Sequence, residues 1–142
     1  MATFNKFEHF VVDLAAGVHT SALNADTDTL RVYLSNATPS AADDAIKADL
    51  AEITNEHGYT SPEDVANAAN IASGVITVSG TDVTITASGG TVGPFRYAVL
   101  YNDTPSSPVD PLIGWWDYGS SITLQDGESF TIDFGASIFT IS

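Results

Sequence analysis

Cysteine and positive charge are what this sequence has least of. None of its 142 residues is cysteine, which excludes disulfide bonds, thiolate nucleophiles and thiolate metal ligands and fits a protein made in a reducing compartment. Only 4 residues are basic, against 18 that are acidic, so the formal net charge is -14 at pH 7. A field of this sign repels phosphate groups and anionic lipid. We therefore expect no nucleic-acid partner.

Long hydrophobic runs are also missing. No stretch approaches the roughly 20 apolar residues that a transmembrane helix needs, so we expect no membrane partner. The opening segment does not resemble a signal peptide, because Lys6 is soon followed by Glu8 and because Asp13 interrupts the apolar run. We expect a soluble, unprocessed protein.

The remaining composition is that of a folded chain. Hydrophobic residues make up 44% of it and charged residues only 15%, unlike the charge-rich composition of disordered chains. A chain of this length buries roughly two thirds of the surface that its unfolded form exposes, and one core is enough for that. We expect a single domain over residues 1–142.

The beginning of the chain combines a helical pattern with a strand pattern. Residues 1–22 are expected to form an amphipathic helix, because apolar residues recur there at spacings of three and four. These residues are Phe4, Phe7, Val11, Leu14 and Val18. Residues 30–35, LRVYLS, alternate apolar and polar side chains and predict a half-buried strand.

Residues 40–72 predict an excursion of helix and loop. Ser40 with Asp43 imitates a capping box at the start of a helix. Ser61 followed by Pro62 is typical of a second helix start. We interpret this segment as a short helical insertion.

Residues 74–142 show the pattern of short β-strands separated by turns. β-Branched residues alternate on both sides of Ser79 to Asp82, which predicts a hairpin there, and Gly127 marks another tight turn. Such a series predicts a β meander. The predicted fold is mainly β: an antiparallel β-sandwich or barrel-like domain with an N-terminal amphipathic helix and a short helical insertion.

Metal-type spacings are absent. The three histidines are His9, His19 and His57, and we interpret all of them as surface residues. The segment NADTDT places Asn24, Asp26 and Asp28 at alternate positions of a calcium loop, but the glycine and the bidentate glutamate of an EF-hand are missing. A weak cation site is the most that this segment supports, and we expect neither a metal nor a cofactor.

Catalytic patterns find little support either. Asp117 with Glu128 or Asp133 imitates the carboxylate pair of a glycosidase, but so many acidic residues form such pairs by chance. The chain contains no nucleophile elbow and no phosphate loop. We therefore expect a protein without enzymatic activity.

Three aromatic residues in GWWDYG allow two interpretations. Trp115, Trp116 and Tyr118 would suit a platform that stacks on sugar rings, as in a carbohydrate-binding module. The favoured interpretation is that alternate members pack into the core and under a loop, as large aromatic side chains usually do.

Arg96 interrupts GPFRYAVLYND, a run otherwise suited to a buried sheet. Regular alternation would place Arg96, Ala98, Leu100 and Asn102 on one face, and Phe95, Tyr97, Val99 and Tyr101 on the other. A guanidinium group at this position suits a bidentate pair with a carboxylate such as Asp117 or Asp103. We expect a structural ion pair, the alternative being a contact with a partner protein.

Several blocks of the sequence resemble a family of small virion proteins encoded by tailed bacteriophages and prophages. GPFRYAVLYND and LIGWWDYG are the most specific blocks, and MATFNKF, LRVYLSNATP and EITNEHGYT extend the resemblance over nearly the whole chain. The segments AADDAIKADLAE and SPEDVANAANIASG look like variable insertions. The resemblance implies a head decoration, or cement, protein of the capsid exterior, made in the cytoplasm of the host bacterium.

The resemblance also implies partners. These are the major capsid protein and further copies of the chain, in a homo-oligomer for which a trimer is favoured. Because terminal segments are loosely held until something docks them, Phe4 and Phe7 are candidate contacts. The alternative function is a carbohydrate-binding or host-attachment module of a phage head or tail fibre, which the tryptophan pair would serve.

Overall fold

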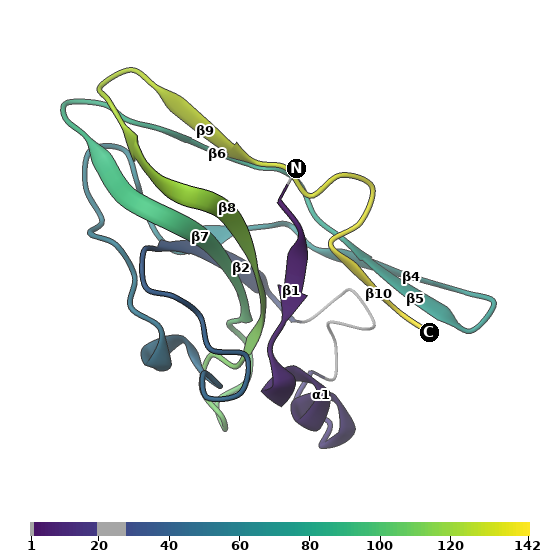
Figure 1. The fold of residues 1–142 in the computed structure, drawn as a ribbon. Coiled ribbons are helices and arrows are strands. Elements are labelled where there is room, and N and C mark those ends of the chain that lie inside the picture. The colour runs from purple at the N-terminus through teal and green to yellow at the C-terminus, as the bar shows by residue number, and fades with distance from the viewer. Residues whose placement is uncertain (1, 20–27) are drawn as a thin grey trace.

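The structure is a computed structural model that describes residues 2–19 and 28–142. In these ranges the chain forms three antiparallel sheets and one α-helix near the N-terminus, so the predicted mainly β fold is confirmed (Figure 1). No described helix has the length and apolar character needed to cross a membrane. The elements are β1 (Phe4–Lys6), α1 (Glu8–Ala15), β2 (Leu30–Ser35), the 3-10 turn η1 (Lys47–Asp49), β3 (Glu63–Asp64), β4 (Ala68–Ala72), β5 (Val75–Ser79), β6 (Val83–Thr86), β7 (Val92–Asn102), β8 (Leu112–Leu124), β9 (Ser129–Ile132) and β10 (Phe139–Ile141).

The largest sheet has the strand order β1-β8-β7-β2-β3. Its centre is the long hairpin of β7 and β8, and β2 pairs with β7 over its whole length. Two smaller sheets, β10-β5-β4 and β6-β9, cover one face of it (Figure 1). The arrangement is sandwich-like, with layers of unequal size.

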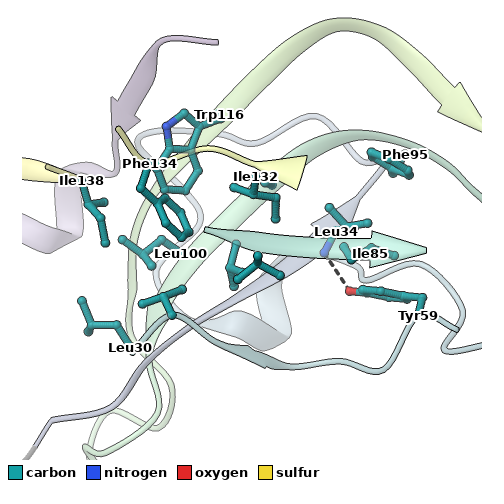
Figure 2. Packing of buried hydrophobic residues seen from close by; sticks show 14 of the residues in the cluster. Leu30, Leu34, Tyr59, Ile85, Phe95, Leu100, Trp116, Ile132, Phe134 and Ile138 are labelled. Carbon is teal, nitrogen blue, oxygen red and sulfur yellow. Dashed lines mark hydrogen bonds between the residues drawn. The ribbon is translucent and has the colours of Figure 1, made fainter. Parts of the chain in front are cut away.

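A first hydrophobic cluster fills the space between the large sheet and the two smaller ones (Figure 2). It includes Leu34, Leu100 and Trp116 on the large sheet and Ile85, Ile132, Phe134 and Ile138 opposite them. β3 pairs only with Arg31 and Val32 of β2. Farther along the same edge, the Tyr59 hydroxyl accepts a 2.8 Å hydrogen bond from the Leu34 amide. The same hydroxyl donates to Glu52 at 3.0 Å, so the buried phenol is satisfied on both sides.

A second cluster lies on the opposite face of the large sheet, under the segment that contains η1. Its members are Phe7, Tyr33, Leu50, Tyr97, Val99, Tyr101 and Leu112. The Tyr33 hydroxyl donates to the Leu50 carbonyl at 3.0 Å, and the Lys47 ammonium lies 4.7 Å from the centre of the Tyr33 ring. The centre of the large sheet is therefore buried on both faces, which explains the near-continuous apolar sequence of β7.

The N-terminal helix is shorter than the predicted range 1–22. Only α1 is helical, and the three residues of β1 form an edge strand instead. Pairing with β8 places Phe4 opposite Trp116, which takes Phe4 out of the helical stripe. Within α1 the buried apolar residue is Phe10, whereas Val11 of the predicted stripe is 48% exposed. The last residues of the predicted helix lie outside the described ranges.

The predicted excursion over residues 40–72, a segment described throughout, is mostly loop, but its only helical part is the 3-10 turn η1, and the two expected helix starts are wrong. Ser40 does donate to Asp43 at 2.8 Å, but a turn follows instead of a helix. The residues after Ser61 form β3 and β4, not a second helix. Pairing of β4 with β5 along five residues supplies the backbone hydrogen bonds there, so tertiary pairing outweighs local propensity.

The hairpin predicted around Ser79 to Asp82 is also wrong. β5 pairs with β4 and β10, whereas β6 pairs with β9 in a different sheet. The connection passes closely over the core, because a Cβ on Gly80 would lie 2.9 Å from Ile138. Asp82 then accepts a 2.9 Å hydrogen bond from the Phe134 amide, which directs the chain into the second sheet.

Gly114 gives a test of how β1 is held. A Cβ at this position would collide with the Phe4 ring and with the Asn5 carbonyl oxygen. We expect Gly114→Val to displace β1 and to lower the free energy of unfolding, measured by chemical denaturation, by about 1–3 kcal/mol. Ser120→Val, at an exposed position of the same strand, is the control and should change it little. Equal denaturation midpoints for the two variants would contradict this packing.

Candidate functional site

An apolar groove of about 490 Å³ lies between β1, α1 and β10. Its apolar lining consists of Phe4, Phe10, Val11, Leu14, Phe139 and Ile141. The Phe139 ring stacks on Phe4 with 5.8 Å between ring centres and meets Phe10 edge-on at 5.4 Å. These aromatic contacts give the groove a fixed wall.

One side of the groove is exposed apolar surface of α1. Val11 lines the groove and is 48% exposed, although most large hydrophobic side chains of the described residues are covered. Its neighbour Val12 is 61% exposed but lies outside the lining. Lys6, one of the few basic residues, also lines the groove. The arrangement suits an apolar segment of a partner that carries a carboxylate near the rim.

The two N-terminal aromatic residues expected as contacts have different positions. Phe4 is half-buried and lines the groove, so it is accessible to a partner. Phe7 is completely buried in the second cluster, where its ring lies 4.6 Å from that of Trp115. Phe7 therefore holds the N-terminal segment on the sheet and offers no surface to a partner.

Arg96 forms the bidentate ion pair expected for it. Its Nε donates to Oδ1 of Asp117 at 2.8 Å and its Nη2 donates to Oδ2 at 3.0 Å. The Gly119 amide donates to the same carboxylate at 2.8 Å, and these hydrogen bonds hold the pKa of Asp117 below its ordinary value, Arg96 contributing most. The other carboxylate considered, Asp103, pairs with Arg31 at 2.7 Å.

The pair lies at an irregularity of the β7–β8 hairpin. Phe95 is opposite Ile122 and Tyr97 is opposite Asp117, so β8 contains extra residues at this point. The extra residues change the alternation of side chains, and Phe95 belongs to the first cluster, whereas Tyr97 belongs to the second. The prediction that Phe95 and Tyr97 share a face is therefore wrong.

The three aromatic residues considered as a sugar platform do not form one surface. Trp116 is buried in the first cluster, 5.4 Å from the Phe134 ring, whereas Trp115 packs against the second cluster on the other face of the sheet. Tyr118 is half-buried with its ring edge-on to Phe130 at 4.8 Å, and burial raises its pKa to about 12. The packing interpretation is thus confirmed for Trp116.

His19 is not the surface residue predicted from the sequence. It is 1% exposed and belongs to a buried polar cluster with Asn102 and Asp28. The Asn102 amide donates to Asp28 Oδ2 at 2.8 Å, and its oxygen accepts from the Thr104 amide at 3.1 Å. These partners fix the orientation of the side-chain amide, so its nitrogen also donates to His19 Nδ1, 3.1 Å away.

This geometry requires a neutral His19. A protonated ring would place an N–H on Nδ1 against the NH2 group of Asn102. Burial lowers the pKa of His19 below its ordinary value of 6.5, opposed by the charges of Asp13 and Asp28. No sequence signal announced this cluster, because Asn102 lies 83 residues from His19 along the chain.

The remaining candidate residues have ordinary surface positions or lie outside the described ranges. His9 and His57 are exposed, as predicted. Glu128 and Asp133 accept backbone hydrogen bonds within their own turns. Of the suggested cation ligands, Asn24 and Asp26 lie outside the described ranges, and within these ranges no three His, Asp or Glu residues are grouped as a metal site.

Comparison of the chain with protein-family models, with curated proteins and with solved structures finds no match. The resemblance to phage virion proteins therefore rests on the sequence blocks themselves. Among the features described above, the groove beside α1 is the one that leaves apolar side chains open to a partner. It is the candidate functional site.

The Arg96–Asp117 pair yields a stability prediction. We expect Arg96→Ala and Asp117→Ala each to lower the melting temperature. The double variant should melt no lower than the less stable of the two single variants, because each single substitution already removes the whole ion pair. The matched control is Arg31→Ala, which breaks a pair of similar exposure and should have a smaller effect, since it closes no irregularity. Strictly additive losses would show that the two residues do not act as a pair.

His19 yields a prediction about pH. The pKa of His19 is lower in the folded protein than in the unfolded chain, so as the pH falls this histidine is protonated in the unfolded chain before it is protonated in the folded protein. The stability of the fold should therefore decrease as the pH drops below 6.5. Chemical denaturation between about pH 7.5 and about pH 5.5 avoids most carboxylate titration. We expect His19→Gln to be less stable than the wild type at the upper pH but to change less with pH. The same pH dependence in both proteins would contradict the buried neutral state.

Proposed function

We propose that the protein is a structural component of a tailed-phage virion, a decoration or cement protein that binds the outer surface of the major capsid shell. The observation that carries the proposal beyond sequence resemblance is the groove beside α1, an apolar hollow in whose lining Val11 is 48% exposed. Exposed apolar surface of this kind marks a binding site for another protein.

The charge of the chain supports an exterior position. With a net charge of -14, the protein is repelled by packaged DNA, whereas a neutral or basic patch of the shell does not repel it. We assign the protein a binding role without enzymatic activity or cofactor. It is made in the cytoplasm of the host bacterium and carried on the capsid exterior. The major capsid protein is its partner, and a trimer remains the oligomer that the resemblance favours.

The groove gives this binding a physical basis. The aromatic rings that form its wall are held by contacts with each other, so little order has to be gained on binding. An apolar segment of the shell that covers Val11 removes about half of a valine side chain from water, which contributes on the order of 1 kcal/mol. Lys6 at the lining adds a charge preference for an acidic neighbour.

The carbohydrate-binding alternative loses the observation on which it rested. Its platform required Trp115 and Trp116 to present their rings together, and these residues pack against different clusters on opposite faces of the sheet. Host attachment through another surface has no specific observation in its favour. The decoration role is therefore the better supported of the two.

The proposal predicts how the protein binds shells. Purified capsid shells of the phage that carries this sequence should bind the wild-type protein in copy numbers comparable to those of the major capsid protein. Val11→Asp should weaken binding about tenfold or more, because it places a charge in the lining of the groove. Quantitative mass spectrometry of pelleted shells measures both.

Val109→Asp is the matched control. Val109 is 53% exposed on the loop between β7 and β8, so the substitution adds the same charge at a similar exposure. It should leave shell binding unchanged. Absence of wild-type protein from the shells would refute the function, and equal loss with both variants would refute the groove as the contact.

A further inference from the structure

The sheet β10-β5-β4 is free of charged residues. Neither residues 65–81 nor residues 134–142, which together contain all three of its strands, include Asp, Glu, Lys or Arg. The rest of the chain carries all 22 charged residues, 18 acidic and 4 basic. In a protein this acidic, an entire sheet without charge is a distinct surface.

The outer strand of this sheet is exposed. In Figure 1 the β4–β5 hairpin extends away from the large sheet. Four of the five residues of β4 are exposed, and Ile71 retains 62% of its surface in contact with solvent. Ile71 lies opposite Ile76 on β5, so its side chain has an apolar neighbour on one side only.

The free edge of β4 is unprotected. One edge pairs with β5 from Ala68 to Ala72, and no strand of the described ranges pairs with the other. Natural edge strands are usually blocked by a charge, a proline, a bulge or a covering segment, because their free N–H and C=O groups otherwise recruit another strand. The sequence AANIA of β4 contains no charge and no proline, and its pairing with β5 is regular.

We propose that β4 pairs, antiparallel, with β4 of a second copy of this chain, which joins two three-stranded sheets into one of six strands. Charge favours a second copy as the occupant. Two chains of charge -14 repel each other when their acidic surfaces meet, and this edge brings no charged side chains together. A basic partner would be attracted to the acidic surfaces instead.

The sequence of β4 is also complementary to itself. When two copies pair antiparallel about Asn70, Ala69 of each lies opposite Ile71 of the other, and Ala68 lies opposite Ala72. The large side chain therefore meets a small one, and the exposed Ile71 gains apolar cover. A two-fold contact of this kind is isologous and does not depend on capsid binding or on a three-fold assembly.

The expected affinity is low. A five-residue edge is small compared with the roughly 1,200–2,000 Å² buried in stable interfaces, so the dimer should appear only at high protein concentration. Salt should strengthen it, because raising the ionic strength from about 0.1 M to about 1 M shortens the Debye length from roughly 10 Å to roughly 3 Å and screens the repulsion between acidic copies.

Sedimentation velocity over a range of concentrations, at low and at high salt, tests the proposal. We expect a monomer–dimer equilibrium in the wild type that shifts toward the dimer in high salt. Ile71→Lys should abolish the dimer with little change in melting temperature, because the side chain is exposed. Since this substitution also reduces the net negative charge, loss of the dimer cannot be a consequence of greater repulsion.

Val109→Lys is the control, because it makes the same change of charge at an exposed residue outside the sheet. It should dimerise at least as well as the wild type. The proposal is overturned by a wild type that stays monomeric under all conditions, by dimerisation that weakens in salt, or by a dimer that Ile71→Lys leaves intact. None of these outcomes bears on whether the protein binds capsid shells.

Discussion

Burial of the β7–β8 hairpin on both faces is the constraint on which the rest of the structure depends. Ala98 and Leu100 face the first cluster, and Val99 and Tyr101 face the second, so the hairpin needs cover on each side. The small sheets cover one face, and the segment around η1 covers the other. β1 pairs with the outer edge of β8, and α1 follows it beside β10, where the groove lies. The groove is therefore a consequence of how the central sheet is covered.

The apolar groove and the charge-free sheet share a strand. Phe139 and Ile141 of β10 line the groove, and β10 also pairs with β5 in the sheet that carries no charge. All Asp, Glu, Lys and Arg residues of the chain thus lie outside the β10-β5-β4 sheet, so a contact at this sheet brings no like-charged side chains together. Both proposals, shell binding at the groove and self-pairing at β4, involve this sheet, the first through β10 and the second through its outer strand.

Local sequence patterns predicted what depends on neighbouring residues. The strand at residues 30–35 was predicted from alternation, but the expectation that it is half-buried is wrong, because both faces of the large sheet are covered and five of its six residues are buried. The pair of Arg96 with Asp117 follows from chemistry, because a rare guanidinium group in an acidic chain finds a carboxylate. Phe95 was assigned to the wrong face, because the extra residues of β8 that shift the register leave no pattern in β7. The exposure of Val11 was not predicted either, since a helix of eight residues has too few turns to define its buried stripe.

Features set by distant parts of the chain were not predictable. The alternating β-branched residues on either side of Ser79 to Asp82 predicted a hairpin, but the strands that pair with them lie near residues 70, 130 and 140. Burial of His19 depends in the same way on Asn102.

We propose that the groove beside α1 is the face that meets the capsid, and an icosahedral reconstruction of the virion tests this most directly. The account predicts density for this chain on the outer shell with α1 and β10 in contact with the major capsid protein; a shell that lacks the chain, or a chain bound with the groove facing solvent, would contradict it.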